Sequence, residues 1–430
     1  MEEIVSHSKR MRRWLAAGVA VATAGLLAAC SATNTGPPTL TWYINPDDGG
    51  QVDIAAKCTQ ASGGTYRIQT SLLPRDAASQ REQLARRLAA GDSSLDIMSL
   101  DPPYVPELAE PGFLAPVPQT VIDQRTTDVV DGARKGAQWN GKYVVIPFWA
   151  NTQLLWYRKS VVEKAGLDMS KPVTWDQIMN VARQTGTHLG VQGIRGESMT
   201  VWVNALMESQ GQSIVIGNAS SADQTQFGLD SPQGVKAAEI IGTIGREGLG
   251  GPGLTTQDEN QSMSTFQGAK GSFMVNWPFV WPATQSAKPE LISDIGWTTY
   301  PRVDANTESA PPLGGIMLGV GAKSKHTDLA FEAVTCITSP ENQAHYFVTN
   351  GNPPASKAAY DDPQVAQKFP MAPVIRTSLD NAKPRPQTPY YNEVSTGLQQ
   401  RWTPVQTVTD QTPAQTQQFL MQVLRGERLL

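Results

Sequence analysis

Three apolar runs decide the fold: LTWYI at residues 40–44, YRIQTSLL at 66–73 and LDIMSL at 95–100. Each run is short and rich in β-branched or aromatic residues, which is typical of strands. Residues 77–90 have the apolar spacing of a helix, and a helix carrying Cys58 is expected between the first two runs. The alternation of strand and helix predicts a parallel sheet with right-handed crossovers, and therefore an α/β fold.

Two acidic residues follow strands of this predicted sheet. Asp48 lies in the turn cluster at residues 45–50, and Asp101 comes directly after the third strand. In open α/β sheets, ligands bind beyond the carboxyl ends of the strands. Asp48 and Asp101 are therefore candidate ligand contacts.

The rest of the chain continues the alternation. We predict further strands at residues 143–147, 154–158 and 271–277, and helices at 200–210, 232–246 and 261–267. Thr174 and Gln177 form a capping box, which predicts a helix from there toward Gln184.

The N-terminus has the three zones of a secretory signal. Residues 9–13 hold four basic side chains, residues 14–27 carry no charge, and LAAC at 27–30 has the form of a lipobox. The apolar run is too short for a comfortable membrane span. We therefore predict a signal peptide over 1–29, a lipid on Cys30 that anchors the protein to the outer face of the cytoplasmic membrane, and a small, polar tether over 30–38. The alternatives are an ordinary secretory signal or an uncleaved anchor.

Composition limits the functions that remain. Removing residues 1–29, with four basic and two acidic side chains, changes the formal charge from −4 to −6. A mildly acidic chain without a basic run is a poor candidate for binding nucleic acid. About 400 residues are too many for one hydrophobic core, so two lobes are expected. No apolar run of membrane-spanning length follows the signal.

Cys58 and Cys336 are the cysteines that remain after lipidation. In an oxidising compartment such a pair predicts a disulfide, with two free buried thiols as the alternative. A bridge over so long a loop would return the late chain to the lobe in which it began.

The chain lacks the usual catalytic and metal-binding motifs. His188, His326 and His345 are scattered, and no His-Glu-x-x-His occurs. Residues 196–200 fail the nucleophile elbow at its last glycine, and residues 268–272 lack the phosphate-loop spacing. We therefore expect a protein that is not an enzyme and needs no metal or cofactor.

What remains is an inventory of binding groups. Aromatic residues gather at predicted strand ends, and short polar residues lie beside them. A sugar needs a flat aromatic surface for its C–H face, and carboxylates or amides around its rim of hydroxyls. Any single aromatic residue is more often core. Trp277 is the best cleft candidate, because Asn276 and Pro278 place it at a strand exit.

Several longer strings resemble one family. These are QLARRL (83–88), NTQLLWYR (151–158), VNWPFV (275–280), LGG (313–315) and RPQTPYY (385–391). With the lipobox and the strand order, they make the chain similar to the carbohydrate-binding proteins of ABC importers, the maltose-binding-protein type. Within that type it most resembles the LpqY group of trehalose-binding lipoproteins, in which the two cysteines have the same places.

The resemblance implies a type II periplasmic-binding-protein fold, with a ligand cleft between two hinged lobes. Crossing segments are expected near residues 147–152 and 300–312. The implied domains are a first lobe of residues 39–147 plus 312–350 and a second lobe of residues 148–311 plus 351–430. A monomer is expected.

The resemblance also implies a set of ligand contacts. Asp101 and Asn151 would bind hydroxyls on the two sides of the cleft, Glu259 would bind them from the second lobe, and Trp277 would stack on a glucose face. The backbone at Gly315 would approach the ligand closely. Arg385 would donate from the C-terminal segment, unless it pairs with Asp380 or Glu393 at the surface. Asp48 is the weakest member of the set.

The expected function is capture of a neutral disaccharide, best trehalose, for a membrane permease and its ATPase. Another sugar or a glycerophosphodiester is an alternative, although a phosphate favours more cationic donors than these. A surface-anchored glycoside hydrolase would need two carboxylates, for instance Asp101 and Glu259. A structural adhesin is disfavoured because the chain has no repeats.

Overall fold

The computed structural model describes residues 36–219 and 221–430. The predicted signal peptide, Cys30 and most of the tether lie outside these residues. Thr39–Leu430 form one compact unit. In the part of the chain that is described, no helix is long and apolar enough to cross a membrane.

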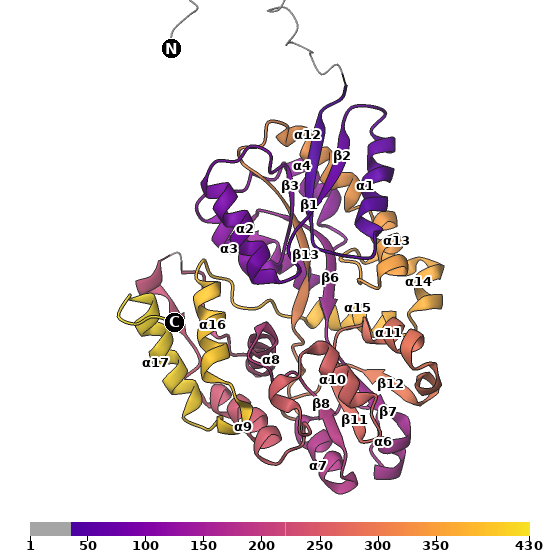
Figure 1. The fold of residues 1–430 in the computed structure, drawn as a ribbon, viewed down its shortest axis with the longest axis vertical. Coiled ribbons are helices and arrows are strands. Elements are labelled where there is room, and N and C mark those ends of the chain that lie inside the picture. Colours follow the sequence, from indigo (N-terminus) through magenta and orange to yellow (C-terminus); the bar gives the residue numbers. More distant parts are fainter. Residues whose placement is uncertain (1–35, 220) are drawn as a thin grey trace, which may run out of the picture. The chain divides into compact units, whose positions relative to one another are not determined.

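Two sheets organise the compact unit (Figure 1). The first has the strand order β2-β1-β3-β13-β6 and the second the order β12-β7-β11-β8. Their bounds are β1 (Thr39–Ile44), β2 (Arg67–Leu72), β3 (Ile97–Leu100), β6 (Ile146–Thr152), β7 (Leu154–Arg158), β8 (His188–Gly190), β11 (Gly271–Asn276), β12 (Ile295–Thr298) and β13 (Leu313–Val320). Two short pairs are formed by β4 (Gln138–Trp139) with β5 (Lys142–Tyr143), and by β9 (Val215–Ile216) with β10 (Gln226–Phe227).

Helices cover both sheets. They are α1 (Gly50–Ala61), α2 (Ala77–Ala89), α3 (Val105–Ala109), α4 (Gln119–Arg125), α5 (Asp131–Gly136), α6 (Lys159–Ala165), α7 (Trp175–Thr185), α8 (Glu197–Glu208), α9 (Pro232–Arg246), α10 (Glu259–Phe266), α11 (Val280–Ala287), α12 (Thr327–Ile337), α13 (Pro340–Asn350), α14 (Pro363–Lys368), α15 (Ala372–Asn381), α16 (Tyr391–Arg401) and α17 (Thr412–Leu424).

The predicted α/β class is confirmed, and the first three strands pair as predicted. β1 is parallel to both β2 and β3. β13 then joins the sheet antiparallel to β3 and β6, so the five-stranded sheet as a whole is mixed. The carboxyl ends of β1 and β3 therefore lie at one edge of the sheet, and the residues that follow them are brought toward the same place.

The period-two alternation of the strands builds the core. In β1, Leu40, Trp42 and Ile44 face one hydrophobic cluster, together with residues of α1, α12 and α13, while Tyr43 faces the opposite cluster with α2 and α3. In β11, Phe273 packs on the side of α7, α8 and α9. We call the five-stranded sheet with α1–α4, α12 and α13 the first lobe, and the four-stranded sheet with α6–α10, α16 and α17 the second lobe.

The late part of the chain returns to the first lobe. Cys58 on α1 and Cys336 on α12 form a disulfide that spans 278 residues, which confirms the predicted pairing. β13 lies between β3 and β6, and α12 packs behind it. The first lobe is therefore assembled from two distant segments of the chain.

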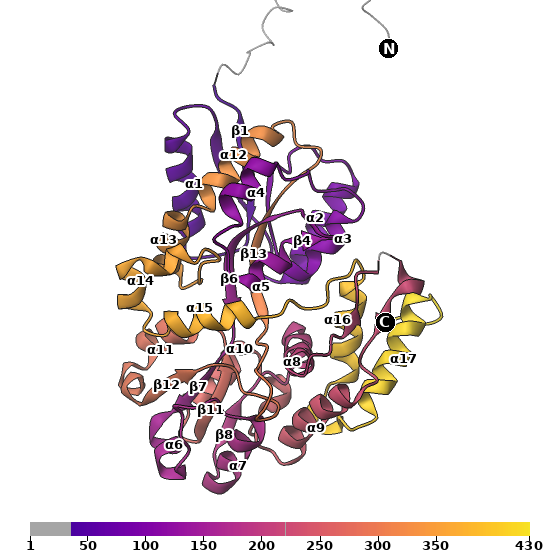
Figure 2. The ribbon, with the colours of Figure 1, turned by 180° about the vertical axis from the view of Figure 1, so that it is seen from behind.

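Three segments connect the two lobes. β6 runs directly into β7, the chain from β12 to β13 returns, and residues 382–390 lead from α15 to α16. The third was not predicted. It is held beside β13, because the backbone N–H of Leu313 donates to the carbonyl of Lys383 at 2.8 Å. Figures 1 and 2 both show α15 between the two sheets. The exact residue bounds proposed for the lobes stay a prediction.

Some predicted element bounds were wrong. The strand expected at 143–147 is instead β5 and β6, so that Phe148–Thr152 are strand rather than connector, because they pair with β13. α8 begins at Glu197 rather than Thr200, and α10 at Glu259 rather than Gln261. The capping box at Thr174 and Gln177 is present, and α9 has the predicted bounds.

Candidate ligand-binding cleft

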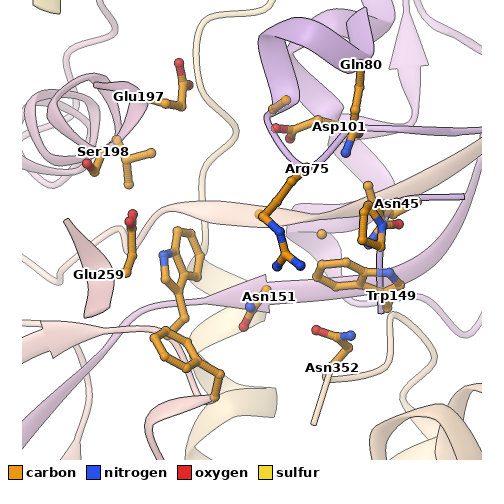
Figure 3. Close-up of a pocket in the computed structure, with 18 of the residues that line it drawn as sticks. Asn45, Arg75, Gln80, Asp101, Trp149, Asn151, Glu197, Ser198, Glu259 and Asn352 are labelled. Carbon is orange, nitrogen blue, oxygen red and sulfur yellow. The ribbon is translucent and has the colours of Figure 1, made fainter. Parts of the chain in front are cut away.

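The main candidate site is a cavity of about 360 Å³ between the two lobes (Figure 3). Its wall includes residues that follow β1 and β3, residues of β6 and β13, the first turns of α8 and α10, and the 382–390 segment. The volume is at the lower end of the roughly 300–1,000 Å³ that is usual for small-molecule sites.

Six of the seven predicted ligand contacts line this cavity: Asp101, Asn151, Glu259, Trp277, Gly315 and Arg385. They come from positions that are up to 284 residues apart in the chain. Asp48 is exposed and lies outside the lining residues. Its neighbour Asp47 accepts from the backbone N–H groups of Gly49 and Gln51, and thus shapes the turn before α1. That these residues bind a ligand stays a prediction.

Trp277 lies on the cavity wall, and the strand exit fixes its position. Asn276 is buried at the end of β11, where its side-chain oxygen accepts from the Trp277 backbone N–H at 2.8 Å and its amide donates to the Glu259 carbonyl at 2.8 Å. Asn276 is therefore structural. Trp149 and Phe279, two further aromatic residues near predicted strand ends, also line the cavity. Most of the other aromatic residues near such ends are buried in the core: Trp42, Tyr43, Phe148, Trp281 and Tyr391.

Gly314 and Gly315 at the start of β13 lie close to the two tryptophans of the cavity, and the expected approach of the Gly315 backbone to a ligand stays a prediction. A Cβ atom on Gly314 would lie 3.1 Å from the Trp277 ring, and one on Gly315 would lie 2.2 Å from the Trp149 carbonyl oxygen. Gly315 also has a φ of +118°, which favours glycine. The glycines therefore make room for the two tryptophans that flank the cavity.

An ion cluster around the buried Arg385 side chain joins opposite walls of the cleft. Arg385 donates from Nη2 to Asp101 Oδ1 at 2.5 Å and from Nη1 to Glu197 Oε1 at 2.7 Å, and its side chain is only 6% exposed. Tyr391 also donates to Glu197 Oε1, and Ser395 donates to Glu197 Oε2 at 2.7 Å. The cluster satisfies buried charges that would be costly alone.

The alternative surface pairing of Arg385 was wrong. Asp380 pairs instead with Lys357 at 3.2 Å, and Arg385 is buried beside Asp101. Sequence reasoning also missed Glu197, because the 196–200 segment was considered only as a possible catalytic turn. A usable signal was present, since an acidic residue in the first turn of a helix favours the positive end of the helix dipole.

Burial perturbs the charged groups of the cleft. It raises the pKa of Asp101, although Arg385 opposes this shift. Burial acts to lower the pKa of Arg385, but the charges of Asp101, Tyr391 and Glu197 outweigh it and raise the pKa well above its ordinary value. The guanidinium is therefore the fixed cation of the cluster.

Glu259 is the second carboxylate at a helix start. Asp258 is the N-cap of α10 and accepts from the backbone N–H groups of Asn260 and Gln261, so Glu259 is the first helical residue. Burial raises the pKa of Glu259, and hydrogen bonds from its own backbone N–H and from the Trp277 side chain act in the opposite direction. Among the described residues, Glu259 has no cationic partner within ion-pair distance. Asp258 is the capping signal that could have placed this helix start.

The other end of the cavity holds polar groups without partners. Asn45 Oδ1 and Trp149 Nε1 are buried and make no hydrogen bond within the described residues. Arg75 is exposed and forms no ion pair there, and Figure 3 shows it reaching toward Trp149 and Asn151. Neither Asn45 nor Arg75 was predicted as a contact, whereas Trp149 was among the aromatic residues that the sequence placed at strand ends.

The cleft therefore combines two indole rings with both donors and acceptors. Arg385 is already paired, which leaves Arg75 as the unpaired cation of the lining. Carboxylates and amides next to aromatic rings suit a neutral molecule with hydroxyl groups, since a hydroxyl both donates and accepts. No group of three His, Cys, Asp or Glu residues in residues 36–219 and 221–430 could hold a metal ion.

Known proteins of similar sequence are solute-binding proteins. A probable ABC transporter-binding protein of Deinococcus radiodurans is 23% identical over 361 residues, which cover 78% of this chain and 80% of the relative. A mannitol-binding protein of Pseudomonas aeruginosa is 24% identical over 317 residues and covers 70% of each chain. A maltotriose-binding protein of Pyrococcus abyssi is 24% identical over 302 residues, with coverage of 69% and 62%.

Solved structures share the fold. The maltose-bound protein MalE3 of T. maritima has a TM-score of 0.75 and 24% identity, and the alignment covers 90% of this chain and 99% of that one. The sugar-binding protein MalE of Xanthomonas citri also has a TM-score of 0.75, at 19% identity, with coverage of 91% and 98%. The fold is thus the two-lobed type II periplasmic-binding-protein fold, as predicted.

The sequence model of bacterial extracellular solute-binding proteins matches residues 67–344, which include strands and helices of both lobes. The chain therefore belongs to the family of bacterial extracellular solute-binding proteins.

Proposed function

We propose that this protein captures a neutral disaccharide, with trehalose as the best candidate, and delivers it to the permease of an ABC importer. The observation that carries the proposal is the lining of the cavity, in which Trp149 and Trp277 flank unpaired acceptors and donors. The proteins of similar sequence that are named for maltotriose and mannitol support a polyhydroxylated ligand. The similarity of strings such as NTQLLWYR and VNWPFV to the trehalose-binding lipoproteins is the reason for naming trehalose.

The size and charge of the cleft narrow the ligand. A cavity of about 360 Å³ favours one or two sugar rings over a long oligosaccharide. Three carboxylates line it, and one of its two arginines is already paired with two of them. A phosphate diester would meet one free cation only, so a neutral sugar is the better fit.

Isothermal titration calorimetry tests the proposal directly. Trehalose should release or absorb heat and raise the melting temperature, while a glycerophosphodiester should do neither. If trehalose gives no heat but maltose or mannitol does, the assignment of trehalose as the ligand is wrong, while the proposal that the protein binds a sugar or polyol is retained. If no sugar or polyol binds, the proposed function fails.

A hydrolase would use Asp101 and Glu259 as its pair of carboxylates. In this structure Asp101 is occupied by Arg385, which disfavours a role as proton donor. Prolonged incubation with trehalose, followed by glucose analysis, should show no turnover.

The lipid on Cys30 belongs to the same proposal. An anchored binding protein stays near its importer, and tethering raises the effective concentration without any added contact. Metabolic labelling with a clickable fatty acid should label the wild-type protein and leave Cys30→Ser unlabelled.

A further inference from the structure

The ion cluster at the cleft joins parts of the protein that a hinge motion would separate. Asp101 follows β3 in the first lobe, whereas Glu197 begins α8 in the second lobe. Arg385 lies between them on the 382–390 segment, which is one of the three connections. Arg385 donates from Nη2 to Asp101 of the first lobe and from Nη1 to Glu197 of the second lobe, so its side chain bridges the two walls of the cleft.

Glu197 is fixed more firmly than Asp101. Its two oxygens accept from Arg385, Tyr391 and Ser395, and Ser395 in turn hydrogen-bonds to Thr200 at 2.8 Å on α8. Asp101 accepts from Arg385 through Oδ1, and no other hydrogen bond to its carboxylate occurs within the described residues. Arg385 is therefore anchored in the second lobe and reaches out to the first.

An aromatic contact lies beside the ion cluster. The rings of Tyr104, which follows Asp101 in a 3-10 turn, and Tyr391 of α16 meet edge to face with centroids 5.2 Å apart. The Arg385 guanidinium carbon lies 5.9 Å from the Tyr391 ring centroid. Opening the cleft would have to break this contact as well as one ion pair.

The crossing segment itself is fixed near Arg385. Asn204 of α8 donates to the Pro384 carbonyl at 3.1 Å, and Lys383 pairs with the start of β13 through its backbone. The backbone just before Arg385 is therefore held by both lobes, by β13 of the first lobe through Lys383 and by α8 of the second lobe through Pro384, and has little freedom to shift. A buried charge that loses its partner is costly, so the cluster favours the arrangement in which both carboxylates are reached.

We infer that Glu197 is a positioning residue for ligand capture: it anchors Arg385 so that Arg385 latches the two cleft walls together before a ligand arrives. The latch consists of Asp101, Glu197, Arg385 and Tyr391. The inference rests on the two-lobed cleft of the proposed function but not on the identity of the sugar. A protein that is partly closed without ligand has a larger binding-competent fraction, which lowers the apparent dissociation constant.

Single-molecule energy transfer on the full-length protein in detergent tests the latch without any sugar. Fluorophores on unnatural amino acids can replace Arg86 on α2, whose side chain is 74% exposed, and Ile216 in β9, which is 45% exposed. One label then sits on each lobe, and the disulfide is untouched. We expect the unliganded wild type to be mostly in the high-transfer, closed state.

The variant Glu197→Gln should lower the closed-to-open ratio roughly tenfold or more, the effect of one lost charge-assisted hydrogen bond. Arg385→Lys keeps the positive charge but lacks the two guanidinium nitrogens that reach both carboxylates, so it should give an intermediate closed-to-open ratio. Glu163→Gln is the matched control, because it makes the same change at an exposed position of α6 in the second lobe, outside the cavity lining. It should leave the distribution unchanged.

Two results would overturn the latch: an unliganded wild type that is as open as Glu197→Gln, or a ratio that Glu197→Gln does not change. Should that variant fail to fold, Ser395→Ala removes only one support of Glu197 and should shift the ratio in the same direction by less. No shift in either Ser395→Ala or Arg385→Lys would also contradict the inference. The measurement uses no sugar. Its outcome therefore does not depend on whether the proposed ligand is correct, and the two proposals can fail separately.

Discussion

The two ends of the cleft hold their charged groups in opposite ways. At one end, the buried Arg385 pairs with two half-buried carboxylates, Asp101 and Glu197. At the other end, Arg75 is exposed and unpaired within the described residues, and Trp149 has an indole N–H without an acceptor. The groups of the paired end therefore hold the protein together, whereas those of the other end are available to a ligand.

The largest effect is expected at the paired end. Arg385→Gln leaves two half-buried carboxylates facing each other without their cation, and should lower the free energy of unfolding by about 3 kcal/mol, the lower end of the cost of breaking a buried ion pair. Sugar binding should become undetectable by calorimetry. Urea denaturation without ligand measures the first effect. A variant with wild-type stability would mean that the two ends do not differ in this way.

The second-largest effect is expected at Trp277 in the wall of the cavity. Trp277→Ala should weaken sugar binding by roughly 1–3 kcal/mol, the scale of a lost aromatic platform. Trp277→Phe keeps a flat ring and should recover most of the affinity. Titration calorimetry of the two variants compares them. Unchanged affinity in the alanine variant would place Trp277 in the core rather than in the binding surface.

Glu259 is a cleft carboxylate without a cationic partner among the described residues, and its substitution separates effects on stability from effects on binding. Because burial raises its pKa, ionisation of Glu259 opposes folding at pH values above the raised pKa, and this cost disappears as the pH falls. Glu259→Gln should therefore raise the melting temperature at pH 7 and weaken sugar binding by about 1 kcal/mol, the difference between a charged and a neutral acceptor. In the wild type, affinity should fall as Glu259 is protonated. A variant that is less stable at pH 7 would contradict this assignment.

The smallest effect is expected at the unpaired end. Arg75→Gln removes an exposed cation that has no partner, so stability should change by less than about 0.5 kcal/mol. Affinity for a neutral sugar should fall by about 0.5–1 kcal/mol, the scale of one hydrogen bond. Calorimetry at two salt concentrations measures this. A loss as large as that of Arg385→Gln would remove the distinction between the two ends.

Much of the fold could be predicted because its signals are local. The strands at the start of the chain and the capping box at Thr174 depend on short patterns, and the structure contains them. The extension of β6 through Thr152 depends on β13, which comes more than 150 residues later and carries no local signal in the 148–152 segment. Likewise, the 382–390 connection is fixed by backbone hydrogen bonds that a sequence pattern does not show.

The site was predictable in its residue types but not in its pairing. Motif similarity identified six residues that line one cavity. It did not show that Arg385 would be buried against Asp101 and Glu197, because distances between remote segments are set by the tertiary fold. Asn45 was missed, and the unpaired indole N–H of Trp149 could not be foreseen, for the same reason, since an unsatisfied hydrogen bond is visible only once the neighbours are in place.

The position of β13 between β3 and β6 has a consequence for the order of folding. During synthesis, residues 39–152 are made long before residues 313–320. Until β13 is available, the sheet of the first lobe is incomplete, and β3 and β6 each have an unpaired edge. Cys58 must likewise wait for Cys336, and the one other cysteine, Cys30, is made first. A lipid thioether on Cys30 would remove that competing thiol. The modification would then protect the oxidative pathway of the nascent chain, in addition to determining where the finished protein resides.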